Sequence, residues 1–137
     1  METAGYSGTP LSKKLGFKSG FKIRLINEPD YYFKLFPNLL TDLVILEDPG
    51  IKKDIIHYFT KEISELERDI MLLKVEIEQN GSIWISWPKK SSKVATNVTE
   101  DLIRNLALTS GLVDVKVCAV DEIWSALKLV IPVKDRL

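Results

Sequence analysis

Hydrophobic residues gather in short stretches along the chain, and three of these predict strands in its first half. Residues 21–26 (FKIRLI) alternate apolar and basic side chains, and Pro29 then stops the pattern because proline cannot continue a strand ladder. Residues 42–48 (DLVILED) and 54–60 (DIIHYFT) have apolar, β-branched or aromatic centres, which are typical of strands covered on both faces. These stretches indicate a largely parallel sheet.

The link between the second and third of these strands leaves their pairing open. It consists of PGIKKD, which is too short for a helical crossover of about a dozen or more residues. The two strands therefore either pair antiparallel or are joined by an extended loop that returns across the sheet.

The strongest pattern predicts one long amphipathic helix over residues 61–78. Its apolar side chains recur every three or four positions, which places them on one stripe of a helix of about five turns. These side chains are Ile63, Leu66, Ile70, Leu73 and Ile77. Thr60 is placed to cap the start of this helix, and Asn80–Gly81 is placed to end it.

A basic loop follows the next predicted strand, at residues 82–87 (SIWISW). After the loop, the apolar positions predict a helix from Val98 to about Leu108. Asn97 and Glu100 have the spacing of a capping box at the start of that helix.

The N-terminal region predicts less regular structure. Residues 1–20 are rich in Gly, Ser and Lys, and we expect a lead-in segment that packs on the domain, with a helical turn between Pro10 and Gly16. Residues 30–36 (DYYFKLF) predict two further helical turns.

The chain closes with two apolar stretches, residues 112–120 and 125–133, which predict an antiparallel hairpin because only the short polar link DEIW joins them. Strands that alternate with helices favour an α/β fold. We therefore predict a single domain over residues 21–137, a small Rossmann-like three-layer domain whose mostly parallel sheet ends in an antiparallel C-terminal hairpin.

Composition narrows the classes of partner. Nineteen basic and nineteen acidic residues among 137 give a formal net charge of zero, so no global field attracts nucleic acid, which makes it an unexpected partner. No apolar run approaches the ~20 residues that span a bilayer, and no membrane partner is expected. The single cysteine, Cys118, fits a reducing compartment, and we expect a cytoplasmic protein.

Three stretches together resemble a family of small bacterial proteins catalogued as domain of unknown function 3052 (DUF3052). They are residues 5–18 (GYSGTPLSKKLGFK), 84–101 (WISWPKKSSKVATNVTED) and 111–130 (GLVDVKVCAVDEIWSALKLV). The likeness spans most of the chain in order, while residues 31–78 match only in pattern. This resemblance implies no established activity and no catalytic residues.

A looser, architectural likeness is to the C-terminal half of class I methyltransferases. In those enzymes a glycine-rich turn for adenosylmethionine follows the first strand, whereas this chain has NEPDYYF and no glycine between Gly20 and Gly50. The backbone therefore cannot come as close to a cofactor there. We expect a relative in shape, with no cofactor.

The basic loop is the best candidate site in the sequence. Its lysines and serines follow a strand end and precede a helix start, and together they could hold a phosphate or carboxylate at the carboxyl edge of the sheet. The predicted anion site comprises Lys89, Lys90, Ser91, Ser92, Lys93 and, opposite them, Asn27 and Glu28. The alternative is a solvated basic loop, because Glu100 and Asp101 compete for the same helix end.

Other chemically capable residues favour structural roles. His57 lies among apolar neighbours, and we expect it to be a core or rim residue with one hydrogen bond. We expect Cys118 to be a small buried hydrophobic residue. Asp121 and Glu122, with Asp114 nearby, are more typical of turn acids than of an acid and base pair. We therefore predict no catalytic residue and no metal site.

Two tryptophans extend the candidate list. We expect Trp84 to be a core residue, while Trp87 and Trp124 lie near element ends, where they could line a pocket or partner surface.

Our first hypothesis is a non-catalytic binding or interaction module, dimeric through an edge strand or the long helix, or bound to a protein partner of unknown identity. The alternative is a small-molecule binding protein or enzyme whose site lies near residues 87–93.

Overall fold

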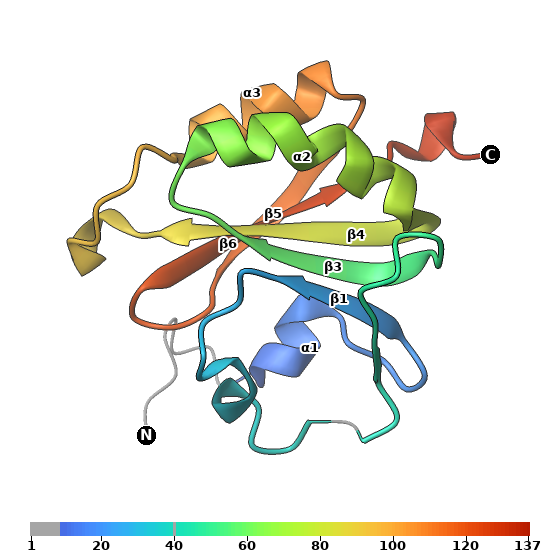
Figure 1. Cartoon of the computed structure of the whole chain (residues 1–137), viewed down its shortest axis with the longest axis horizontal. Helices are drawn as coiled ribbons and strands as arrows, with labels where there is room; N and C mark the ends of the chain where they lie inside the picture. Colours follow the sequence, from blue (N-terminus) through green and yellow to red (C-terminus); the bar gives the residue numbers. More distant parts are fainter. Residues whose placement is uncertain (1–8, 40) are drawn as a thin grey trace.

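Six strands form one sheet in the order β2-β1-β3-β4-β6-β5 in the computed structural model, which describes residues 9–39 and 41–137 (Figure 1). The strands are β1 (Lys22–Ile26), β2 (Val44–Ile45), β3 (Lys53–Phe59), β4 (Ile77–Pro88), β5 (Val113–Ala119) and β6 (Trp124–Val130). Strands β1 to β4 pair in parallel, and β6 runs antiparallel to both β4 and β5. The predicted mostly parallel sheet with an antiparallel C-terminal hairpin is confirmed.

Helices cover both faces of this sheet and make the predicted three layers. They are α1 (Leu11–Leu15), α2 (Ile63–Glu76) and α3 (Glu100–Thr109), with 3-10 turns η1 (Tyr32–Leu35), η2 (Lys90–Ser92) and η3 (Val133–Asp135). Helices α2 and α3 lie on one face, and α1 and η1 lie on the other (Figure 1). The first eight residues of the predicted lead-in, 1–20, lie outside the described residues. Within the described part of the chain, no helix is long and apolar enough to cross a lipid bilayer.

The core consists of two apolar clusters, one on each face of the sheet. Ile56 and Tyr58 of β3 pack in the cluster beneath α2 and α3, whereas Ile55 and Phe59 pack in the cluster over α1. Both faces of β3 are therefore buried, which explains its apolar and aromatic enrichment and confirms the prediction for this strand.

The prediction that residues 42–48 form a strand covered on both faces is wrong. Only β2 is extended there, it lies at the edge of the sheet, and the side chains of Val44 and Ile45 are 42% and 44% exposed. Strand β1 lies between β2 and β3, so an extended loop returns across the sheet, which was one of the two open alternatives. A short apolar run has the same pattern at an edge as at the centre of a sheet.

The predicted end of the long helix at Asn80–Gly81 is also wrong. Helix α2 ends at Glu76, and β4 begins at Ile77 without a turn. Gly81 instead lies inside β4, where a Cβ atom would be 3.0 Å from the backbone oxygens of Lys53 and Asp54. Glycine is needed there because the backbones of β3 and β4 approach closely beside a shift in their register.

The predicted capping box of Asn97 and Glu100 is wrong as well. Thr99 caps α3, because its side chain accepts a hydrogen bond from the Leu102 backbone N–H. The Asn97 side chain instead accepts one from the Ile63 N–H at 2.8 Å, so it caps the start of α2 from a distant segment.

Candidate functional site

The carboxyl ends of the parallel strands meet at one edge of the sheet, which we call the carboxyl edge. Asn27 follows β1, Thr60 follows β3 and Lys89 follows β4. Ligands of open parallel α/β sheets bind outside this edge. The predicted anion-site residues at the ends of β1 and β4 are separated by β3, which places them two strand spacings apart, roughly 10 Å.

The loop after β1, residues 27–31, crosses this edge, and we call it the β1 loop. Asn27 has a left-handed backbone (φ 57°), and its side-chain amide donates to the Phe59 carbonyl at the end of β3. At the other end of the loop, the Tyr31 hydroxyl donates to Asp121 at 2.7 Å in the link between β5 and β6. Burial and the bond to Asp121 raise the pKa of Tyr31 to about 12. The β1 loop is thus fixed at both ends across the edge.

Tyr32, the residue after the β1 loop, anchors the chain on the face of the sheet that α1 covers. Its hydroxyl shares a hydrogen bond of 2.9 Å with His57 Nδ1, and His57 Nε2 shares one of 2.7 Å with Ser86 Oγ. All three side chains are at most 1% exposed. Burial lowers the pKa of His57 to about 3, so the imidazole is neutral at pH 7. This histidine is a core residue, as predicted, with two hydrogen bonds rather than one.

The basic loop, residues 89–93, has a defined conformation. The Lys89 N–H donates to the Ile123 carbonyl at 2.7 Å, which ties the loop to the β5–β6 link. Ser92 Oγ donates to the Lys89 carbonyl and accepts from the Val94 N–H, so Ser92 shapes the loop. Lys93 ends the η2 turn with a left-handed backbone (φ 61°).

The lysines of this loop have no ion-pair partner in the described part of the chain. Within the residues that the structure describes, no carboxylate lies within 4.0 Å of the side chains of Lys89, Lys90 or Lys93. Lys90, Ser91 and Lys93 are exposed, and Lys89 is half-buried. The loop therefore carries a local excess of positive charge on a chain of zero net charge.

The acidic residues that were expected to compete with a ligand have other partners. Glu100 and Asp101 both pair with Arg104 on the same helix, Asp101 at 2.8 Å. The Leu102 N–H at the start of α3 is bonded to Thr99 and is not available to a ligand. The Leu102 N–H is therefore taken, while a contribution of the N–H groups before it to the anion site stays a prediction.

The three tryptophans lie in the core. Trp84 is fully buried, as predicted, and its ring N–H donates to the Leu15 carbonyl. Trp87 is 8% exposed in the cluster beneath α2 and α3, and Trp124 is 7% exposed with its ring edge-on to Phe59 at 5.0 Å. That Trp87 or Trp124 lines a pocket or partner surface stays a prediction.

Asp121 shapes the hairpin link. One carboxylate oxygen accepts from the Ile123 and Trp124 N–H groups at 2.8 Å each, while the other accepts from Tyr31. Glu122 beside it is exposed. This geometry is that of a turn acid, as the sequence indicated.

Asp114 and Cys118 both lie on β5. Asp114 accepts from Arg104 at 3.1 Å, and burial raises the pKa of the half-buried Cys118 thiol. Across residues 9–39 and 41–137, no group of three or more His, Cys, Asp or Glu side chains is placed to hold a metal ion.

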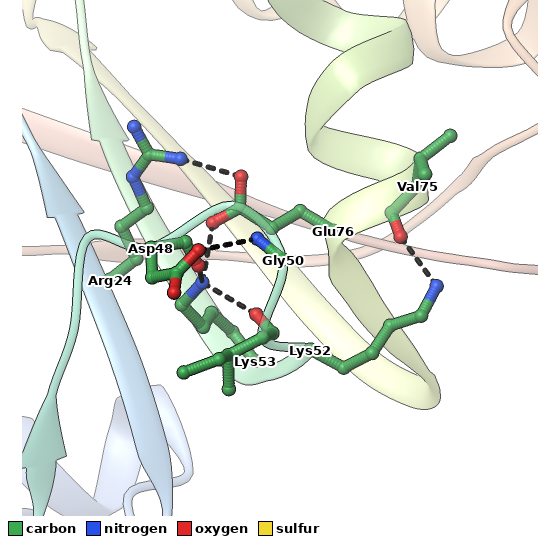
Figure 2. A network of polar contacts seen from close by, with 8 residues as sticks. Arg24, Asp48, Gly50, Lys52, Lys53, Val75 and Glu76 are labelled. Atoms are coloured by element: carbon green, nitrogen blue, oxygen red, sulfur yellow. Dashed lines mark hydrogen bonds and ion pairs between the residues drawn. The ribbon is translucent and has the colours of Figure 1, made fainter.

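Sequence reasoning missed a buried ion network on the α2 face (Figure 2). Glu76 of α2 is 5% exposed and accepts from Arg24 of β1 at 2.5 Å and from Lys53 of β3 at 2.8 Å. Lys53 is 0% exposed, and it also donates to the backbone carbonyls of Asp48 and Ile51. One signal was available, because Glu76 lies three positions after Leu73, on the apolar stripe of α2.

Comparison with known proteins gives a family and a fold. A family model described as protein of unknown function (DUF3052) matches residues 39–133. No curated protein matches the sequence. The predicted resemblance to this family is confirmed.

Solved methyltransferases share the fold at low sequence identity. A SAM-dependent methyltransferase from Aquifex aeolicus is 13% identical with a TM-score of 0.62, over 88% of this chain and 87% of that one. The ribosomal protein L11 methylase from Lactobacillus delbrueckii subsp. bulgaricus is 11% identical with a TM-score of 0.56, over 85% and 72%. An O-methyltransferase of neocarzinostatin biosynthesis, solved with S-adenosylmethionine, is 5% identical with a TM-score of 0.60, over 82% and 49%. The predicted architectural likeness is confirmed.

Proposed function

Because this chain belongs to the DUF3052 family of proteins of unknown function, we propose its function from the site alone: it is a non-catalytic binding module on a methyltransferase-like sheet. Its ligand is a small molecule that bears a phosphate or carboxylate group. The ligand binds at the basic loop, residues 89–93, on the carboxyl edge.

The β1 loop supports the absence of methyl transfer. In parallel α/β sheets the ligand crevice opens where successive connections leave on opposite sides of the sheet, which here is between β1 and β3. Asn27 bridges those two strand ends, and Tyr31 carries the same loop on to Asp121. The segment that would leave room for a cofactor such as adenosylmethionine is bonded across the edge instead.

The single observation that carries the anion site is a set of three lysines that have no ion-pair partner among the described residues, on a loop tied to the β5–β6 link. Like charges held close together repel one another, and an anion placed among them removes that repulsion. The exposed hydroxyl of Ser91 adds a neutral donor beside them.

A thermal-shift panel tests this proposal. The panel holds inorganic phosphate, pyrophosphate, ATP, citrate and adenosylmethionine, measured on the wild type, on Lys89→Ala/Lys90→Ala and on a matched control, Lys18→Ala/Lys134→Ala. A ligand at a hundred times its Kd adds ~2.7 kcal/mol to the free energy of unfolding, which raises Tm by on the order of 10 °C. We expect an anion to give such a shift in the wild type and the control, smaller at high salt, and none in Lys89→Ala/Lys90→Ala.

Three outcomes would overturn the proposal. No shift with any anion would make the loop a solvated connection and direct the search to a protein partner. A shift that persists in Lys89→Ala/Lys90→Ala would place the site elsewhere. A shift with adenosylmethionine alone, in all three proteins, would contradict the non-catalytic assignment.

A further inference from the structure

A groove lies between α2 and β1, on the face of the sheet that α2 covers. Its cavity volume is about 490 Å³, within the range of small-molecule sites. Arg24 and Ile26 of β1 line one side, and Leu72 and Val75 of α2 line the other. Leu72 and Val75 are 68% and 65% exposed, so this wall is apolar and open to solvent. The groove shares no residue with the basic loop.

Arg24 brings an incompletely used guanidinium to this groove. Its Nη1 donates to Glu76, but its Nε is buried and has no hydrogen-bond partner among the described residues. Figure 2 shows its second terminal nitrogen directed away from Glu76, with no partner drawn. The side chain is 26% exposed, so a molecule in the groove can reach it.

Arg24 has no carboxylate to itself. Arg24 and Lys53 share the single carboxylate of Glu76, and both Lys53 and Glu76 are almost completely buried. The other acid that lines the groove, Asp69, is held by two hydrogen bonds from Arg68. These Arg68 bonds hold the pKa of Asp69 below its usual range.

Arg24, Lys53 and Arg68 face the carboxylates of Glu76 and Asp69, and Glu65 also acts electrostatically on Tyr58 and Arg68. The groups around the groove are therefore close to neutral overall, and the feature that remains is Arg24, whose Nε has no partner among the described residues. A guanidinium with unused donors in partly desolvated surroundings is stabilised by a bound carboxylate.

We propose that the groove binds a small organic monocarboxylate with an apolar body, of the alkanoate class. The carboxylate accepts from the free donors of Arg24, whose planar guanidinium matches carboxylate geometry. The hydrocarbon body packs against Ile26, Leu72 and Val75. A carboxylate supplies the acceptors that the Arg24 guanidinium lacks, and the apolar wall favours a ligand with a hydrocarbon body. This site is additional to the proposed function at the basic loop.

Hexanoate is the probe, and hexanamide is its uncharged control of the same shape. We expect hexanoate to cause saturable chemical-shift changes at backbone amides of β1 and α2 in two-dimensional NMR, with hexanamide at least about tenfold weaker. Leu72→Glu, which places a carboxylate on the open wall, should weaken hexanoate by about tenfold or more through like-charge repulsion. Leu108→Glu, at a position 56% exposed on α3, should leave it unchanged.

Two further variants separate the possible failures. Arg24→Met should abolish hexanoate binding, and Leu72→Glu keeps the test decisive if Arg24→Met fails to fold. Lys89→Ala/Lys90→Ala should bind hexanoate as the wild type does, which keeps this site distinct from the basic loop. Equal binding of hexanamide, no saturable shift with hexanoate, or full binding by Leu72→Glu would overturn the proposal.

Discussion

Removing the carboxylate of Glu76 is the sharpest test of the buried ion network. Glu76→Gln keeps the side-chain shape but leaves Lys53, which is 0% exposed, without its negative partner at 2.8 Å. Removing one partner of a buried pair destabilises a protein by roughly 3–5 kcal/mol. Lys53 keeps its bonds to the carbonyls of Asp48 and Ile51, so we expect about 3 kcal/mol, the lower end of that range.

Urea unfolding at pH 7 measures this loss. With an m-value of about 2 kcal/mol/M, a loss of about 3 kcal/mol lowers the midpoint by roughly 1.5 M at unchanged m. Lys53→Met/Glu76→Leu should recover most of the loss, because an apolar pair of similar volume replaces both buried charges. Glu100→Gln, which removes a partner of Arg104 at a half-buried position near the surface, serves as the control and should cost about 1 kcal/mol or less. A loss below about 1 kcal/mol for Glu76→Gln would refute the reasoning, since Lys53 would then not depend on that carboxylate.

Two further predictions concern His57 and Asn97. The pKa of His57 is about 3 in the folded protein and about 6.5 when unfolded, so the unfolded state takes up a proton first and stability falls as pH drops below 6.5. Urea unfolding should show a loss of about 2 kcal/mol between pH 7 and pH 5 in the wild type beyond that in His57→Gln, and equal losses would contradict this assignment. Asn97→Ala should cost ~1 kcal/mol and speed hydrogen exchange at the first turn of α2, since the cap on the Ile63 N–H is lost. Asn105→Ala, at an exposed position on α3, should leave exchange at α2 unchanged, and unaltered exchange in Asn97→Ala would show that its side chain is not the cap.

The sequence was sufficient for elements whose pattern repeats. The stripe from Ile63 to Leu73 predicted α2, because burial of one face of a helix imposes a period on its residues. The apolar stretches of β3 and β4 predicted the central strands, because burial on both faces favours consecutive apolar residues. The hairpin of β5 and β6 was predictable because its pairing is local.

Element ends were less predictable because tertiary contacts decide them. Asn97 had the local spacing of a cap for α3, but it caps α2, and Thr99 takes the nearer place. Glycine often ends a helix, but Gly81 lies where the backbones of β3 and β4 approach too closely for a larger side chain. Local preference was overruled in both cases by a contact with a distant segment.

The candidate site also has some features that the sequence could predict and others that it could not. The three lysines of the basic loop are neighbours in sequence, so their cluster was visible. The course of the β1 loop across the carboxyl edge was not predictable, because the hydrogen bond from Tyr31 to Asp121 joins residues 90 positions apart. The Arg24 network was equally hidden, since Glu76 is 52 positions from Arg24 and 23 from Lys53.

The cap of α2 also bears on the order in which the chain can fold during synthesis. Asn97 is added 34 residues after Ile63, and Thr96 beside it donates to the Lys61 carbonyl. In a nascent chain that ends before residue 96, the Ile63 N–H and the Lys61 carbonyl are therefore hydrogen-bonded to water. They gain their protein partners only after β4 has formed alongside β3, parallel to it. Closing that long segment costs entropy before its contacts form. The N-terminal cap of α2 is thus completed only when the segment that follows β4 reaches it.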